Sequence, residues 1–365
     1  MLNTCFSKGD QMRITYFDTV ILFCLNRING ERTIYSLYHL FQGKKSSQTI
    51  QDAHLFGLSS FFNTVPFIRR AGLEEAAAIL HDKRLIKENE GRRYFLTAEG
   101  KQVLDVHIEK NPLPLYLDGW KYHNMADLFW ERLSLLTQVS SNLLYRQKTF
   151  TPVQKRKETT EWVKGYLKQQ GSNRDQLAKA LYNELLECLE NRQGIDPALL
   201  IMRLSGYRMI GLTSMQAAER AGLEFFYYHL YFLNVLHFML NEIIDNRSKY
   251  PVLSNLIMDP GRIVPLTMST EKTFQLISDG KTIQEIARIR KLKVNTIEDH
   301  VVEIALNVQE FDIRPYVELE KQRTILAAAR KISAKKLKAI RDEAKDATYF
   351  EIRLVLARHG EEQWN

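Results

Sequence analysis

The sequence predicts a mainly α protein with several modules: an N-terminal winged helix with a small β-hairpin wing, a helical middle domain and a C-terminal helix-turn-helix domain. Apolar residues recur at helical spacing along most of the 365 residues, and glycines end several of these runs. A single pair of short β-prone runs predicts one hairpin. Hydrophobic residues make up 45% of the chain and charged residues 26%, as in ordinary globular proteins with well-formed cores.

The N-terminal module, residues 13–110, has the element order of a winged helix. The predicted helices cover residues 16–28, 33–41, 48–55 and 73–82, and the β-prone runs cover 85–87 and 94–97. Gly30 and Gly43 separate the first three helices, and helix, glycine turn, helix is typical of helix-turn-helix units. A hairpin that follows such a unit directly indicates a wing.

The middle domain, residues 120–250, follows a boundary that contains Pro112 and Pro114. Its second half predicts helices over 198–209, 214–220 with Thr213 as cap, and 224–240. The last of these helices is aromatic around nearly its whole circumference, which favours core packing or a protein interface over stacking on unpaired bases. The basic run 146–157 is read as a solvated linker, with a strap along phosphates as the alternative.

The C-terminal domain, residues 262–365, follows Pro260 and Pro265 and contains the clearest local pattern in the chain. Its predicted helices cover 269–278, 283–288 with Thr282 as cap, 296–305 with Asn295 as cap, 325–331, 334–344 and 349–356. A basic turn over 288–294 joins the second helix to the third. This order predicts a three-helix helix-turn-helix core followed by three supporting helices.

Two strings resemble enzyme motifs, but each lacks the residues that its chemistry requires. The segment 354–365 is close to a histidine-phosphatase signature around His359, yet no downstream domain supplies the second histidine and the arginines of a phosphate pocket. The string 342–346 resembles a helicase magnesium box, and the chain has no phosphate-binding GxxxxGK[ST] loop. Three scattered cysteines show neither zinc-ligand spacing nor a disulfide framework. We therefore expect no catalytic activity, metal or cofactor.

Helix-turn-helix geometry and a net charge of +8 point instead to DNA. The predicted contacts are Lys44, Lys45, Ser46, Ser47, Gln48, Thr49, Arg92 and Arg93 in the N-terminal module, and Lys281, Arg288, Arg290, Lys291, Lys293, Asn295, Thr296 and His300 in the C-terminal one. In the C-terminal module, Glu298, Asp299 and Glu303 share the predicted recognition helix and would repel phosphates. The N-terminal edge is therefore the more DNA-like, and either module could instead bind protein.

Two segments resemble the YpbB-like family: residues 43–53, and residues 280–287 running on to 349–357. The second block is similar to the helicase helix-turn-helix domain at the C-terminus of some RecQ-type DNA helicases. The resemblance implies an accessory subunit that works with a RecQ-type helicase in DNA repair and recombination, supplying DNA- and partner-binding modules in trans. It implies no catalytic residues.

The expected function is thus that of a DNA-binding adaptor, on duplex or junction DNA. The alternative is a helix-turn-helix transcription regulator, which would be a dimer because half-sites need two-fold symmetry; the sequence leaves the oligomeric state open. Residues 1–10 lack the pattern of a signal peptide, and no apolar run is long enough to span a membrane. We expect a cytoplasmic, nucleoid-associated protein, with Met12 as a second candidate start.

Overall fold

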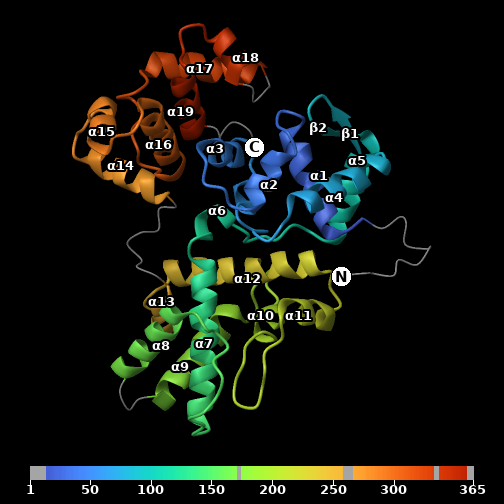
Figure 1. Ribbon diagram of the computed structural model, residues 1–365, viewed down its shortest axis with the longest axis vertical. Helices are drawn as coiled ribbons and strands as arrows, with labels where there is room; N and C mark the ends of the chain where they lie inside the picture. Colours follow the sequence, from blue (N-terminus) through green and yellow to red (C-terminus); the bar gives the residue numbers. More distant parts are fainter. Residues whose placement is uncertain (1–13, 171–173, 258–265, 333–336, 360–365) are drawn as a thin grey trace.

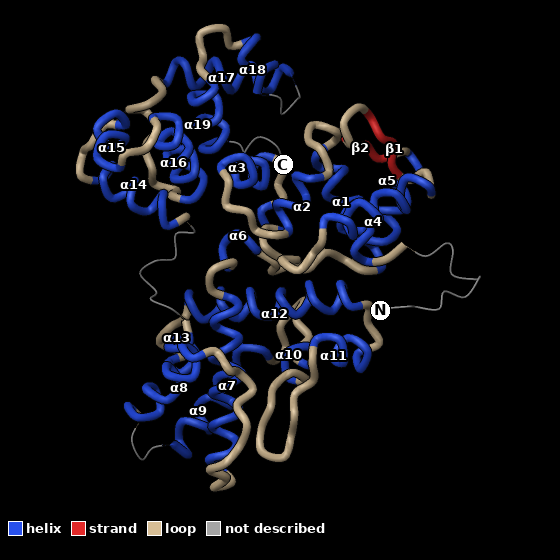
Figure 2. Tube along the Cα trace, viewed as in Figure 1, coloured by secondary structure: helices blue, strands red, loops and turns tan. Residues whose placement is uncertain are grey.

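The computed structural model describes residues 14–170, 174–257, 266–332 and 337–359, and it is mainly helical, as predicted (Figures 1 and 2). Along these four stretches, no helix has both the length and the apolar character needed to cross a bilayer. The candidate start at Met12, the prolines at 260 and 265, and the last six residues of the phosphatase-like string lie outside the described residues, as does the start of the predicted 334–344 helix.

The N-terminal part is a winged helix. Its elements are α1 (Tyr16–Ile28), α2 (Tyr35–Phe41), α3 (Ser47–Leu55), the 3-10 turn η1 (Ser59–Phe61), α4 (Arg70–Asp82), β1 (Ile86–Asn89), β2 (Arg93–Leu96) and α5 (Ala98–Lys110). The two strands are antiparallel, with Ile86 opposite Leu96, which confirms the predicted hairpin. The turn between them places Gly91 and Arg92 at positive φ. The helix that precedes the wing is α4, so α4 holds the position of a recognition helix.

The middle part contains α6 (Gly119–Tyr122), α7 (Ala126–Leu144), α8 (Lys157–Gln169), α9 (Arg174–Leu189), α10 (Ala198–Ile201), α11 (Ser214–Ala221), α12 (Phe225–Asp245) and α13 (Pro251–Leu256). Thr213 caps α11 through a reciprocal bond with Gln216, as predicted. The predicted helix over 198–209 is wrong, because α10 ends at Ile201. The chain turns instead at Gly206, where an added Cβ would lie 2.8 Å from Ser141 Oγ.

Helix α12 is a platform between the winged helix and the rest of the middle part (Figure 1). Its Phe226 ring stacks on Phe17 of α1 with centroids 4.4 Å apart. The neighbouring Tyr228 is fully buried on the other side and donates a hydrogen bond to the Leu199 carbonyl at 2.6 Å. These aromatic side chains therefore pack in cores on opposite sides of one helix, as the packing interpretation predicted.

The C-terminal part contains α14 (Met268–Ser278), α15 (Ile283–Arg290), α16 (Val294–Asn307), α17 (Leu319–Ile332), α18 (Leu337–Glu343) and α19 (Tyr349–His359). Thr282 and Glu285 form the reciprocal cap of α15, as predicted. The predicted cap at Asn295 is wrong. Lys291 ends α15 in the left-handed conformation, and the chain enters α16 so soon afterwards that Asn295 lies in its first turn.

The winged helix and the C-terminal part share one hydrophobic core, which contains Ile50 of α3, Val301 of α16 and Leu354 of α19. Arg353 of α19 adds polar contacts at this junction: its Nε donates to Gln51 Oε1 at 2.7 Å, and its Nη1 lies 2.6 Å from Asp299 Oδ1. Helix α3 is therefore an internal helix of the assembled molecule, although nearly 300 residues separate it from α19.

Replacing Arg353 with alanine should loosen this junction. The buried Gln51 side chain would lose its partner and Asp299 its counter-ion, so we expect the free energy of unfolding to fall by about 1–3 kcal/mol. Hydrogen exchange should quicken in α3 and stay unchanged in α9. Arg323→Ala, which removes an exposed pair with Glu320, is the matched control and should change little. Equal effects of both variants would contradict this account.

Candidate nucleic-acid interface

The predicted DNA contacts at residues 44–49, before and within α3, are only partly available to a ligand. Thr49 is 7% exposed and Gln51 6% exposed. Gln51 contacts Arg353 of α19, whereas Thr49 lies beside Ser46 in the wall of a groove. Ser46 is the cap of α3 and accepts a hydrogen bond from Thr49 N. Lys45 Nζ donates to Asn124 Oδ1 at 2.8 Å, so it also bridges to the loop before α7. Thr49 therefore has little exposed surface, while Lys44, Ser47 and Gln48 keep exposed or partly exposed side chains, and all four stay predicted contacts.

The exposed helix of the winged unit is α4. Its inner face, which includes Leu73 and Leu80, is fully buried. The outer face begins with Arg69 and Arg70 and continues through small side chains at Ala71, Gly72 and Ala78, all of them exposed. Sequence reasoning missed the two arginines. The signal that could have found them is their place directly before the helix that leads into the wing.

A cluster of four side chains fixes the wing to α4 and α2. Tyr35 Oη donates to Glu74 Oε1 at 2.6 Å and accepts from Arg92. Arg92 Nη1 lies 2.6 Å and Arg70 Nε 3.3 Å from the same carboxylate, and the Arg70 guanidinium lies 4.0 Å from the centre of the Tyr35 ring. The hydrogen bond from Tyr35 and the two arginines lower the pKa of Glu74. The cluster keeps one net positive charge and holds the predicted contact Arg92 in place.

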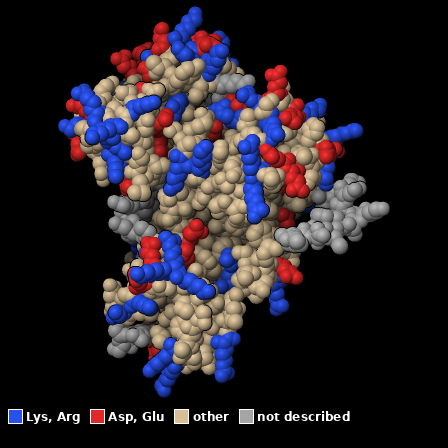
Figure 3. All heavy atoms as spheres, in the orientation of Figure 1, with Lys and Arg blue, Asp and Glu red and all other residues tan. Residues whose placement is uncertain are grey.

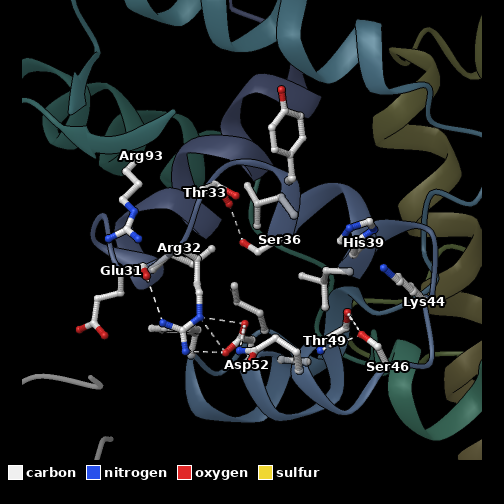
Figure 4. A pocket seen from close by; sticks show the side chains of 18 of the residues that line it. Glu31, Arg32, Thr33, Ser36, His39, Lys44, Ser46, Thr49, Asp52 and Arg93 are labelled. Carbon is white, nitrogen blue, oxygen red and sulfur yellow. Dashed lines mark hydrogen bonds and ion pairs between the residues drawn. The ribbon is translucent and has the colours of Figure 1, made fainter. Parts of the chain in front are cut away.

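A groove of about 650 Å³ runs beside this cluster (Figure 4). It lies between the winged helix and α18, and its charged and polar lining is Glu31, Arg32, Thr33, Tyr35, Ser36, His39, Lys44, Ser46, Gln48, Thr49, Asp52, Arg93 and Lys338. Arg32 and Asp52 form a two-pronged ion pair with a 2.9 Å contact, so their charges cancel. Partial burial and the cations Lys44 and Arg70 lower the pKa of His39. The groove is therefore electropositive without depending on a protonated histidine.

Two of the predicted contacts in the C-terminal module point inward. Arg290 donates to the Ser269 carbonyl at 2.7 Å and to Thr273. His300 is 8% exposed, and its Nδ1 lies 2.8 Å from Thr273 Oγ1. His300 therefore has little surface for a DNA contact, and the Arg290 guanidinium is occupied within the domain; both stay predicted contacts. Among the remaining predicted residues, Lys281, Arg288, Lys291, Lys293 and Asn295 are exposed and Thr296 is half-buried.

The acids of α16 are mostly turned away from solvent. Asp299 pairs with Arg353, and Glu303 accepts a hydrogen bond from Thr270 Oγ1 at 2.7 Å. Burial raises the pKa of Glu303 and of Glu298. The repulsion expected from these carboxylates is therefore weakened. In Figure 3, lysine and arginine side chains lie along the outer edge of α14 and α15, with some acidic side chains among them.

Among the described residues, no three histidine, cysteine, aspartate or glutamate side chains are placed to hold a metal ion together. Cys24 and Cys188 are buried, and burial raises the pKa of both thiols. A raised pKa keeps a thiol protonated and unreactive at neutral pH.

Comparison with known proteins identifies the family of this chain. Residues 269–356, which run from α14 to α19, match a family model described as a helix-turn-helix domain. The chain is 36% identical to protein YpbB of Bacillus subtilis (strain 168) over 349 residues, which are 95% of this chain and 98% of that protein. The chain belongs to the YpbB family. No solved structure matches it. For this YpbB family member, the helix-turn-helix domain indicates DNA binding.

The buried His300 should make stability depend on pH rather than contribute to DNA binding. Burial and the nearby Arg290 lower its pKa to about 4, below the ordinary 6.5. The unfolded chain therefore binds more protons between pH 6.5 and pH 4, so stability is lost as the pH falls through that range. His300→Gln should show a smaller loss of Tm between pH 7 and pH 5 and unchanged DNA affinity. The exposed His81→Gln is the control, and a weakened DNA complex in His300→Gln would contradict this assignment.

Proposed function

We propose that this YpbB family member is a DNA-binding accessory protein that grips duplex DNA with α4 and the wing of its winged helix and has no catalytic step of its own. The observation that carries the proposal is the contrast between two helices. Helix α3 packs against α16 and α19 of the C-terminal part. The outer face of α4 is exposed, and the wing contacts this helix through β1 and the Arg92–Glu74 ion pair. The exposed turn around Lys291, between α15 and α16, is the second contact.

The side chains on α4 favour binding to the DNA backbone over sequence reading. Arginines contact phosphates at the helix start, and small residues such as Ala71 and Ala78 let a helix sit deep in the major groove. The acids of this face, Glu75 and Asp82, lie further from that start. Along α4 no asparagine or glutamine is available to pair with adenine. This composition supports an accessory role over a regulator that reads a defined operator.

The finer part of the proposal is the partner, a RecQ-type DNA helicase, with a role in repair and recombination at the nucleoid. Its support is the resemblance of residues 280–287 and 349–357 to a helicase helix-turn-helix domain. These segments form α15 with its Thr282 cap and α19. Both belong to the body that also carries the winged helix, so a bound helicase would be held at a fixed distance from the DNA contact.

Neutralising Arg69 and Arg93 together should weaken binding to duplexes of any sequence. If each arginine contacts one phosphate, the slope of log affinity against log salt should fall by about 2. The matched control is Lys164→Ala with Lys168→Ala, which removes the same charge from exposed positions on α8. Fluorescence anisotropy across a salt series measures both. An unchanged slope in the arginine variant would remove α4 and the wing as the contact.

The helicase partnership predicts a direct complex. Adding the purified chain to a RecQ-type helicase from the same organism should raise the rate of strand separation, and the arginine double variant should raise it less. Analytical ultracentrifugation of the mixture should show the complex without DNA. Separate sedimentation of the two proteins would contradict the partnership without affecting the DNA-binding proposal.

A further inference from the structure

We propose that the groove between the winged helix and α18 holds single-stranded DNA, so that the preferred ligand is a duplex with a single-stranded arm. This inference rests on the proposed DNA-binding function and adds the class of DNA. Nothing in the helix-turn-helix pattern of the sequence points to this groove, because the winged helix supplies most of its lining and the distant residues Leu337 and Lys338 of α18 complete it.

The size of the groove selects one strand. Its volume of about 650 Å³ lies in the range of pockets that enclose a molecule of roughly drug size. One or two nucleotides match that scale, whereas a duplex, whose major groove alone admits a whole α-helix, does not. Duplex DNA can therefore lie on α4 and the wing but cannot enter this space.

The chemistry of the groove suits a strand with unpaired bases. Lys44, Arg93 and Lys338 are exposed cations from different elements, and in Figure 4 Thr33 and Ser36 lie between Arg93 and Lys44. The buried side chains behind them are apolar and include Ile28, Leu37, Leu40, Ala53, Phe56 and Leu58. The partly exposed rings of the lining are those of Tyr35 and His39. Cations that follow a backbone beside rings on which bases can stack are the usual composition of single-strand grooves.

The groove continues directly from the proposed duplex surface. Tyr35 lines the groove, and its ring also lies 4.0 Å from the Arg70 guanidinium and 5.7 Å from that of Arg92. In Figure 4, Arg93 lies at one end of the space, with His39 and Lys44 at the other. A strand that separates from the duplex at the wing would therefore meet cations at both ends of the groove.

Two acids of the lining do not oppose this use. Asp52 is neutralised by Arg32. The Glu31 carboxylate points away from the space between the labelled side chains in Figure 4. Of the groove cations, only Lys338 comes from the C-terminal part, so the site is complete only when α18 is held over the winged helix by the contacts of α3 with α16 and α19.

The test compares three labelled DNAs by fluorescence anisotropy: a blunt duplex, the same duplex with one oligothymidine arm, and the arm alone. The full-length chain should bind the armed duplex about tenfold more tightly than the blunt one, because the arm adds contacts at high effective concentration. Lys338→Glu should reduce that ratio towards one while the affinity for the blunt duplex stays the same. Lys345→Glu is the matched control, since this exposed lysine follows α18 and does not line the groove.

Equal affinity for blunt and armed duplex would overturn the inference and leave duplex binding intact. So would equal effects of Lys338→Glu and Lys345→Glu on the ratio. Absence of binding to every DNA would overturn the proposed function together with the inference. Photocrosslinking from iododeoxyuridine in the arm gives an independent readout: adducts on peptides that contain Tyr35 or His39 support the groove, and adducts confined to α4 or to the middle part contradict it.

Discussion

The burial of α3 against α16 and α19 determines which surfaces of the molecule remain free. It joins the first and last parts of the chain through one hydrophobic core and brings α18 beside the winged helix. A polar helix can be buried only if its side chains find partners, because an unpaired buried polar group costs about 1–3 kcal/mol. The three buried polar residues of α3 have partners: Asp52 pairs with Arg32, Gln51 accepts from Arg353, and Thr49 bonds Ser46.

The same internal pairing changes the electrostatics of the C-terminal helix-turn-helix. If α16 were fully exposed, its three acidic side chains would repel the phosphates of DNA. In the folded chain, Asp299 and Glu303 serve the packing of α16 against α19 and α14, while the cations of the preceding turn stay exposed. Carboxylates that face the protein interior repel a bound phosphate less than exposed carboxylates do. The exposed surface of this module is therefore more positive than its sequence indicates.

Local features of this fold could be predicted from the sequence, since their causes are local. Thr213 and Thr282 cap helices through residues three positions away, and the hairpin that pairs Ile86 with Leu96 forms around a short turn. The misplaced elements have distant causes. Helix α10 ends early where Gly206 packs on Ser141 of α7, and the covering of α3 depends on Arg353. A single sequence carries no periodicity that records such contacts, so it favours α3 as the DNA-binding helix, whereas the structure shows α4 as the more exposed helix of the winged unit.

The middle part bears on function through its rigid connection to the winged helix. Besides the stacked rings on α12, Tyr231 Oη donates to the Pro112 carbonyl at 2.8 Å, and Tyr116 N donates to Asn234 Oδ1 at 2.6 Å. These bonds tie down the segment that the sequence marks as a boundary, and a boundary crossed by hydrogen bonds and stacked rings is less free to move than an open linker. Any partner that binds the middle or C-terminal part is therefore held in one orientation relative to α4 and the wing. For the adaptor role proposed above, this arrangement would fix the direction in which DNA is presented to a helicase.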